Sequence, residues 1–407
     1  MARLRAILLS GRMKSSWRMA LQYILVFGAG GVSLPFIGLW LRAQGLGGAE
    51  IGVLLAAPML GRIVTGPAIA LWADGFAHRR TAIAFLAVLG TAAYAAMPVV
   101  HGFGWWAPLW FVAATCAGAI MPLSDVLTMR LAAREGFAFS VPRGFGSAAF
   151  VGANVLVGAL LVTASVDLVM IWLIGAGALL VIWARFGLPS EPVLEGGPAA
   201  GLERFRGLHR LLADPVFMAA IVAVGCVQAS HAFYYGFSAI LWKAAGVPES
   251  LTGLLWGASV LVEIAFMWWI DPWRRRVGIG PLVMLGLGAA GGVVRWGLFA
   301  LEPPLWSLWP LQVLHTFTFA ATFLAGVQLV ERLSPPDSHT AAQTLSSMLS
   351  AGVLIGLATL ASGPLFDQFG AGGYWAMAAL AAVGGLVAIG LARSGRVRAE
   401  YRANPVG

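Results

Sequence analysis

Residues 49–73 read AEIGVLLAAPMLGRIVTGPAIALWA, and this stretch decides the class of protein. It is long enough to cross a bilayer as a helix, which takes about 20 mostly apolar residues. Similar runs recur along the whole chain, whose 407 residues are 59% hydrophobic and 11% charged. With a mean hydropathy of +0.84, the chain is expected to be an all-α integral membrane protein.

Arg62 stands near the middle of this stretch, and five more ionisable side chains lie inside other apolar stretches. A charge at the centre of a bilayer costs roughly 2.5–3.5 kcal/mol, so these groups should face one another across a polar cavity rather than face lipid. The other five are Asp125, His231, Glu263, Arg295 and His315. Their placement predicts a functional cavity inside the membrane.

Twelve spans are predicted from the apolar runs between turn and charge clusters. They lie near 18–42, 49–73, 81–100, 105–130, 142–164, 167–187, 214–242, 249–271, 278–300, 304–332, 338–365 and 370–392. The loops on one side, with both chain ends, hold 22 of the 26 Lys and Arg residues. By the positive-inside rule both termini of this multi-pass protein are expected to be cytoplasmic.

A polar segment, residues 188–213, separates spans six and seven and is expected to be a cytoplasmic linker. It divides the chain into two six-helix bundles, 1–187 and 214–407. The pair Asp214-Pro215 predicts a helix N-cap followed by a first-turn proline.

The two halves are predicted to be repeats of each other. Arg42-Ala-Gln-Gly45 matches Lys243-Ala-Ala-Gly246 at an offset of 201 residues (243 minus 42), and the same offset places Arg62 on Glu263. Two pseudo-symmetric six-helix halves with a binding site at the midplane describe the major facilitator fold.

The loop after the second span, residues 70–80 (ALWADGFAHRR), resembles the signature loop of major facilitator transporters. Residues 271–276 (DPWRRR) are its weaker counterpart in the second half. The resemblance implies a part in conformational change for Asp74, Arg79, Arg80 and Asp271.

Four further segments carry a more specific resemblance that covers essentially the whole chain. They are SHAFYYGFSAILWKAAG (230–246), GVVRWG (292–297), LQVLH (311–315) and PRGFGSAAF (142–150). Together they resemble the bacterial 3-phenylpropionate transporter group, which is near the lactose-permease type of proton symporter.

That resemblance implies roles for particular residues. Asp125 and Arg143 match substrate-binding positions, Glu263 matches a substrate-contacting and coupling acid, and Arg295 and His315 match the proton machinery. The carboxylate that carries the proton in lactose permease falls at Thr318 in this chain. A sugar symport mechanism therefore cannot be copied across unchanged.

The residues themselves suggest how the cavity works. Glu263 shares a helical face with Ser259 and Trp256, and its partly desolvated carboxyl could take up and release a proton, with Asp125 as a second titrating acid. Arg62 is expected across the cavity from Glu263, where it could pair with that acid or hold a substrate carboxylate. The side chains expected to line the substrate pocket beside Arg62, Asp125 and Arg143 are His231, Tyr234, Tyr235, Trp256 and Trp296.

The function expected from the sequence is secondary transport by alternating access, most simply the import of a small aromatic or other organic carboxylate with a proton. The alternatives are a proton-coupled sugar or nucleoside symporter and a non-transporting assembly factor of the same fold. No metal-ligand cluster, phosphate-binding loop, dinucleotide fingerprint or nucleophile motif stands in a usable context, so neither enzymatic chemistry nor a cofactor other than the proton is expected. The net charge of +9 is attributed to orientation in the bilayer rather than to nucleic acid, and a monomer is expected.

Overall fold

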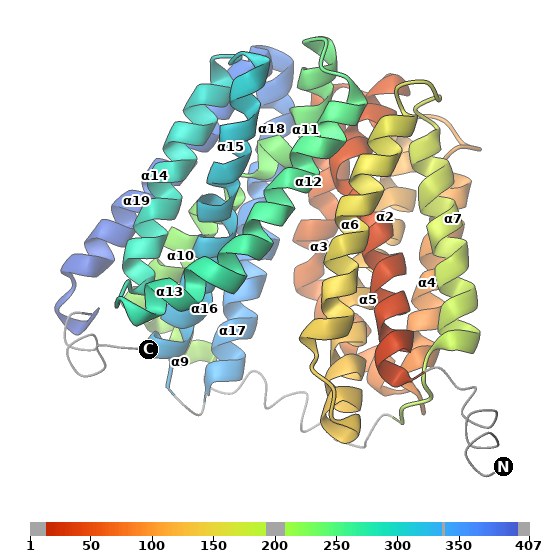
Figure 1. Ribbon diagram of the computed structural model, residues 1–407, viewed down its shortest axis with the longest axis horizontal. Coiled ribbons are helices and arrows are strands. Elements are labelled where there is room, and N and C mark those ends of the chain that lie inside the picture. Colours follow the sequence, from red (N-terminus) through yellow and green to blue (C-terminus); the bar gives the residue numbers. More distant parts are fainter. Residues whose placement is uncertain (1–13, 193–207, 336–337, 398–407) are drawn as a thin grey trace. The chain divides into compact units, whose positions relative to one another are not determined.

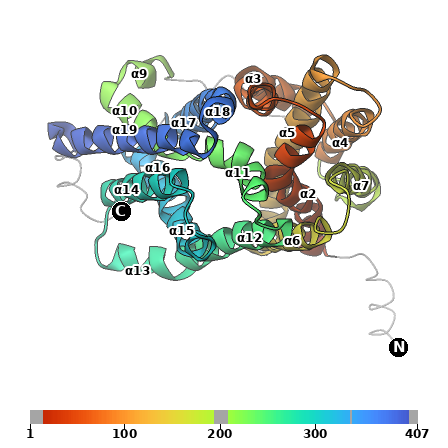
Figure 2. The same ribbon diagram turned by 90° about the horizontal axis from the view of Figure 1, so that it is seen from above.

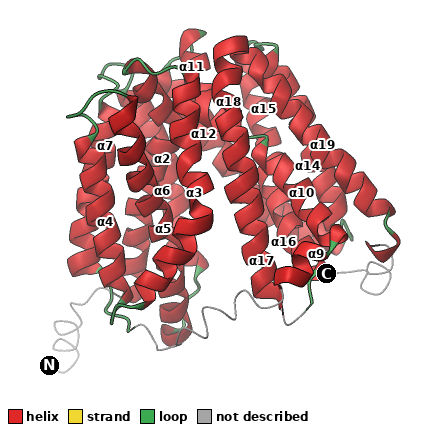
Figure 3. Cartoon of the chain, turned by 180° about the vertical axis from the view of Figure 1, so that it is seen from behind, coloured by secondary structure: helices red, strands yellow, loops and turns green. Residues whose placement is uncertain are grey.

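Helices make up every regular element of the structure, a computed structural model that describes residues 14–192, 208–335 and 338–397. Within these ranges no strand occurs, as Figure 3 shows, and the one isolated β-bridge joins His78 to Pro192. A helix satisfies its own backbone hydrogen bonds, which the interior of a bilayer requires. The expected all-α class is confirmed.

The first six helices account for the six spans predicted before the linker. Their bounds are α2 Ser15–Ala43, α3 Gly48–Asp74, α4 Arg79–Ala96, α5 Phe103–Glu135, α6 Ser140–Leu160 and α7 Leu168–Ile182, the last continued by a π-helical turn at Trp183–Gly187. The predicted linker includes residues 193–207, which lie outside the described residues.

Several of the later spans are built from two helices that follow each other end to end. The helices are α9 Leu208–Ala213, α10 Pro215–Ala229, α11 Ala232–Ala244, α12 Glu249–Ala265, α13 Asp271–Arg276, α14 Pro281–Ala300, α15 Leu308–His315, α16 Thr322–Leu333, α17 His339–Ser347, α18 Ile355–Phe369 and α19 Tyr374–Arg393. The π-helical turns Phe266–Ile270, Thr316–Ala321 and Met348–Leu354 join α12 to α13, α15 to α16 and α17 to α18.

In the described residues ten helical stretches are long and apolar enough to cross a membrane. One of them, His339–Arg393, is 55 residues long and turns at Gly370, whose φ of 52° breaks the helix between α18 and α19. Helix α4 is not among the ten and begins with Arg79 and Arg80. The helices are therefore consistent with the twelve predicted spans.

Contacts group the chain into two units, which do not follow the predicted sequence halves. Unit 1 comprises Met1–Ser33, Gly66–Val157 and Asp167–Leu194; unit 2 comprises Leu34–Thr65, Gly158–Val166 and Glu195–Gly407. The boundaries cut α2, α3 and α6, because one end of each helix packs on helices of the second half. These units describe packing, and the division into two six-helix repeats stays a prediction.

Unit 1 is built around α4, which packs along α5 and α7. Its core is a cluster of buried aliphatic residues that includes Ile83, Leu86, Ile120 and Leu127. In unit 2, α19 packs along both α10 and α14, and these helices lie side by side in Figures 1 and 2.

Unit 2 also contains a close seam between α3 and α18. The backbone N–H groups of Gly48 and Ala49 donate to the two carboxylate oxygens of Asp367, at 2.7 and 2.8 Å. Gly48 and Gly363 lack side chains where the two backbones meet, and a Cβ on either would collide with the opposite helix. Small residues of this kind let membrane helices approach closely, and Asp367 satisfies the free amides at the start of α3.

The predicted N-cap at Asp214 is confirmed. Its Oδ1 accepts from the backbone N–H groups of Val216 and Phe217, at 3.0 and 3.3 Å, and Pro215 occupies the first turn of α10.

Candidate functional site

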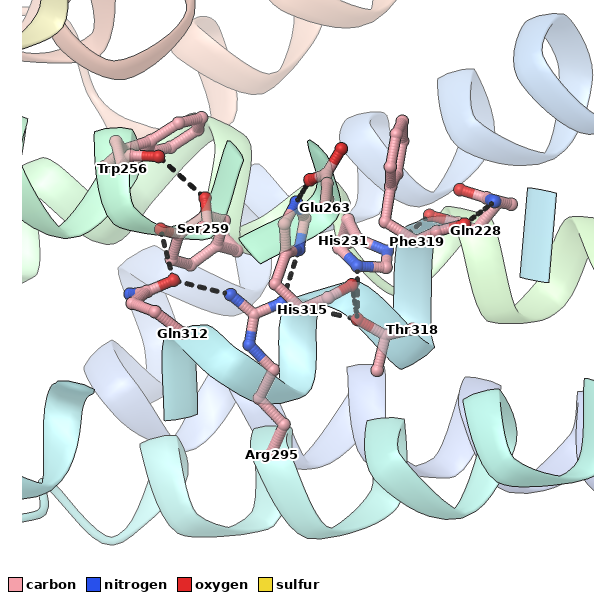
Figure 4. A network of polar contacts seen from close by, with 11 residues as sticks. Gln228, His231, Trp256, Ser259, Glu263, Arg295, Gln312, His315, Thr318 and Phe319 are labelled. Atoms are coloured by element: carbon pink, nitrogen blue, oxygen red, sulfur yellow. Dashed lines mark hydrogen bonds and ion pairs between the residues drawn. The ribbon is translucent and has the colours of Figure 1, made fainter. Parts of the chain in front are cut away.

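A network of buried polar side chains lies within unit 2, drawn in Figure 4. Helix α12 contributes Glu263, α14 contributes Arg295, and α15 contributes Gln312 and His315. Thr318 follows in the π-helical turn, and His231 stands between α10 and α11. The sequence analysis singled out five of these residues, all except Gln312, and the tertiary structure brings all six into one network.

Glu263, His315 and Arg295 form its centre. His315 Nε2 lies 2.8 Å from Glu263 Oε1, and His315 Nδ1 lies 2.8 Å from Arg295 Nη1. An arginine can only donate, so Nδ1 accepts and the ring hydrogen is on Nε2, which donates to Glu263. His315 is therefore neutral and connects a carboxylate to a guanidinium.

Arg295 is fully buried, and its other contacts, besides His315, are also with uncharged side chains. Its Nη2 donates to Gln312 Oε1 at 3.0 Å and its Nη1 lies 3.4 Å from Thr318 Oγ1. The guanidinium also lies 4.9 Å and 4.4 Å from the ring centroids of Tyr234 and Trp296, close enough for cation–π attraction. Glu263 is the nearest carboxylate in the network and reaches Arg295 only through His315.

Thr318 connects the second histidine, His231, to Arg295. His231 Nδ1 lies 3.0 Å from the carbonyl oxygen of Gln228, so it carries the hydrogen. His231 Nε2 lies 2.9 Å from Thr318 Oγ1, and the single hydrogen of that hydroxyl can go either to this nitrogen or to the carbonyl oxygen of His315 at 3.1 Å. The position of the family's proton-carrying carboxylate thus holds a neutral, fully buried relay between His231 and Arg295.

The π-helical turn Thr316–Ala321 lies in the network. His315 and Thr318 are three residues apart and share one face of the helix. A π-turn inserts an extra residue, rotates the side chains that follow, and leaves carbonyl oxygens without their usual partners. Gln228 Nε2 donates to the freed carbonyl of Phe319 at 3.1 Å, and Thr322 Oγ1 donates to that of Phe317 at 3.0 Å. Such turns occur often at functional sites.

The predicted aromatic residues do gather around this network. Tyr234 stacks on Trp256 with centroids 4.7 Å apart, and Tyr235 stacks on His231 at 5.6 Å. Tyr234, Trp256 and Trp296 are buried against one another and Arg295, whereas Tyr235 is partly exposed. Trp256 Nε1 is buried without an acceptor among the described residues.

A second polar group lies in unit 1 and contains Asp125 and Arg143. Asp125 Oδ1 accepts from the Tyr23 hydroxyl at 2.6 Å and lies 4.0 Å from Arg143 Nε. The Arg143 guanidinium covers the ring of Phe27 at 4.1 Å. Both charged side chains are about one third exposed. The sequence interpretation missed Tyr23 and Phe27, although the adjacent polar pair Gln22-Tyr23 in an apolar span was a signal.

The expected ion pair between Arg62 and Glu263 is not formed in this structure. The Glu263 carboxylate binds His315, and Arg62 is exposed on α3 with no ion pair or hydrogen bond in the part of the chain that is described. The repeat offset aligned two positions in sequence, but in the structure His315 on α15 is the partner of the acid.

The signature-loop residues form local ion pairs. Asp74 Oδ1 lies 3.2 Å from Arg79 Nη2, and Arg80 Nη1 lies 3.5 Å from the carbonyl oxygen of Leu188. Asp271 is buried and pairs with Arg274 at 2.6 Å and Arg275 at 2.9 Å. Their part in conformational change stays a prediction.

No group of three or more His, Cys, Asp or Glu side chains that could hold a metal ion occurs within the described ranges. The two cysteines, Cys116 and Cys226, are free and buried.

Comparison with known proteins identifies the family. A family model described as the MFS_1 like family matches residues 16–377. This chain belongs to that family. It is a multi-pass integral membrane transporter of the major facilitator superfamily and not an enzyme.

Two curated relatives span nearly the whole chain. The "Probable 3-phenylpropionic acid transporter" of Escherichia coli (strain K12) is 28% identical over 381 residues, covering 91% of this chain and 96% of its own. The maltose permease of Geobacillus stearothermophilus is 26% identical over 401 residues, covering 93% and 95%.

The fold matches solved transporters at lower identity. The nucleoside transporter NupG has a TM-score of 0.79 at 15% identity, covering 94% of this chain and all of its own. A D-xylose-proton symporter has a TM-score of 0.65 at 14% identity, covering 93% and 96%. The expected major facilitator fold is confirmed.

Proposed function

We propose that this transporter imports a small aromatic or other organic carboxylate together with a proton, by alternating access. The observation that carries the proposal is the Glu263–His315–Arg295 relay. A buried acid that is connected to a buried guanidinium through a neutral imidazole can gain and lose a proton without rearranging the guanidinium.

The relay suggests how proton and substrate are coupled. When Glu263 is ionised, its negative charge balances Arg295 through His315. When Glu263 gains a proton, the Arg295 charge is left uncompensated in the buried site, which favours a nearby anion. Because coupling between two ligands is reciprocal, a bound carboxylate also favours protonation of Glu263.

Arg62 is the residue that we propose to hold the substrate carboxylate. A guanidinium in an apolar span needs a counter-charge or water, and Arg62 has no carboxylate partner in the described segments. Its planar fork of donors matches a carboxylate. Tyr235 and the unpaired indole N–H of Trp256 could contact the rest of the substrate, and the name of the first relative supports an aromatic acid.

A sugar substrate is the second candidate. Asp125 with its Tyr23 and Arg143 partners is a polar group of the kind that binds hydroxyls, and one relative is named as a maltose permease.

Transport by protein reconstituted in vesicles tests these proposals. A carboxylate with one negative charge that moves with one proton transfers no net charge, so a pH gradient should drive its accumulation and a membrane potential alone should not. The panel should contain 3-phenylpropionate, benzoate, the amide of 3-phenylpropionate, maltose and a nucleoside. Accumulation of maltose instead would favour the second candidate, and absence of saturable flux for all of them would favour an assembly factor.

Arg62→Gln provides the substrate-side test. We expect a higher KM for the carboxylate in exchange assays, with Arg393→Gln, an exposed arginine at the end of α19, as the matched control. An unchanged KM would remove Arg62 from the substrate site. We also propose that the protein is a monomer of the bacterial inner membrane with both termini in the cytoplasm.

A further inference from the structure

A basic cavity of about 950 Å³ lies within unit 1, and its lining shares no residue with the two polar groups described above. It opens among the start of α2, the start of α4, the end of α5 and the π-helical turn after α7. Its charged lining comprises four cations and one carboxylate: Lys14, Arg18, Arg80, Arg134 and Glu135. The transport proposal makes no use of this cavity.

The carboxylate does not neutralise this lining. Glu135 accepts from Ser15 Oγ at 2.7 Å and from Arg134 at 3.3 Å. Arg134 is also paired with Glu191, at 2.6 Å. Arg18 donates to the carbonyl oxygen of Gly187 and Arg80 approaches that of Leu188. With four cations in its lining against the carboxylates of Glu135 and Glu191, the cavity keeps an excess of positive charge.

Two neutral features add donors. Ser15 and Ser16 line the cavity and form the first turn of α2, whose leading backbone N–H groups have no acceptor within the helix. The start of a 29-residue helix also contributes a partial positive charge. Trp183, another lining residue, has a buried indole N–H without an acceptor among the described residues.

Exposed apolar side chains occur in the lining of the cavity and next to lining residues in the sequence. Phe186 lines it and is 73% exposed, and Ile182, one turn earlier on α7, is 58% exposed. Trp17, between the lining residues Ser16 and Arg18, is 54% exposed. Cations beside exposed apolar groups at the end of membrane helices match a phosphate carrying acyl chains, and basic pockets between such helices do bind lipid headgroups.

We propose that this cavity binds the phosphate group of an anionic phospholipid. Lys14, Arg18 and Arg80 would surround the phosphate with the first amides of α2, and the acyl chains would lie along Phe186 and Ile182. A free phosphate compound has the same headgroup chemistry but would gain nothing from the apolar border.

Binding to the full-length purified protein, stripped of lipid in neutral detergent, tests the proposal. Short-chain phosphatidylglycerol should bind saturably and raise the melting temperature, whereas short-chain phosphatidylcholine and inorganic phosphate should bind much more weakly. Lys14→Gln and Arg18→Gln should each weaken phosphatidylglycerol about fivefold, the effect of about 1 kcal/mol per cation. Arg393→Gln is the control, because it removes an exposed arginine outside the cavity.

Unchanged melting of the unliganded variants shows that they fold. An equal loss of affinity in Arg393→Gln would mean general attraction to a basic surface and would overturn the proposal, as would equal binding of the two lipids. If inorganic phosphate bound as tightly as phosphatidylglycerol, the site would belong to a free phosphate compound rather than to a lipid.

Discussion

Glu263 is the residue on which proton coupling depends in this proposal, since Thr318 replaces the carboxylate expected from the lactose-permease resemblance. Its Oε1 accepts from His315, and the relay to Arg295 makes both ring nitrogens of that histidine unavailable for a second proton. The added proton must therefore reside on the acid.

Glu263→Gln should abolish accumulation against a gradient and preserve exchange of substrate across the membrane. The glutamine amide imitates the protonated acid but cannot lose or gain a proton, so the coupling cycle cannot be completed. Counterflow and gradient-driven uptake in the same vesicles measure the two activities. Glu331→Gln, an exposed position on α16, is the matched control. A Glu263→Gln protein that still concentrates substrate would move the coupling to Asp125 or His315.

Thr318→Val should destabilise the protein by about 1–3 kcal/mol, because His231 Nε2 would be left buried without its hydrogen-bond partner. The fully buried setting offers no water to replace the hydroxyl. Thr318→Ser keeps the donor and should stay near wild type. Thermal unfolding in detergent compares the three proteins; if the valine and serine variants melted together, the hydroxyl would have no structural part in the network.

Among the helices, the seam between α3 and α18 depends on two glycines and one carboxylate. Asp367 holds the first amides of α3, and Gly363 meets Gly48 backbone to backbone. The seam fixes the end of the helix that carries Arg62, so its geometry bears on the proposed substrate contact.

Gly363→Ala should destabilise the protein by about 1–3 kcal/mol, because its Cβ would collide with the Gly48 carbonyl oxygen and approach Ala49 Cα at 2.8 Å. Gly390→Ala in α19 is the control. It meets nothing within 4 Å and should be neutral or gain up to about 1 kcal/mol from helix propensity. Equal melting temperatures for the two variants would show that the two helices can move apart at Gly363 without loss of stability.

At the scale of the whole molecule, the distribution of basic residues predicts the orientation in the bilayer. The chain ends and the loops on one predicted side of the membrane hold 22 of the 26 Lys and Arg residues. The structure guides where to test it. Gly48 is packed against α18 and is unsuitable for a label, whereas Ala43 at the end of α2 and His209 in α9 are exposed.

Single cysteines at Ala43 and His209, in a background lacking Cys116 and Cys226, should react from opposite sides of the membrane. An impermeant maleimide should label Ala43→Cys in intact cells and His209→Cys only after the inner membrane is opened. Labelling of His209→Cys in intact cells with Ala43→Cys protected would reverse the proposed topology, and labelling of both in intact cells would contradict their placement on opposite sides.

The sequence alone determined the class of this protein, the approximate position of its helices and which polar residues lie in the membrane. Those features depend on local composition, since an apolar run must be helical in lipid and a charge within it must be satisfied. Only the tertiary structure decided the partners: Glu263 with His315 rather than Arg62, Thr318 with His231, and Tyr23 with Asp125. Pairing depends on helix rotation, and a π-turn or a close glycine contact changes that rotation without changing the hydrophobic pattern.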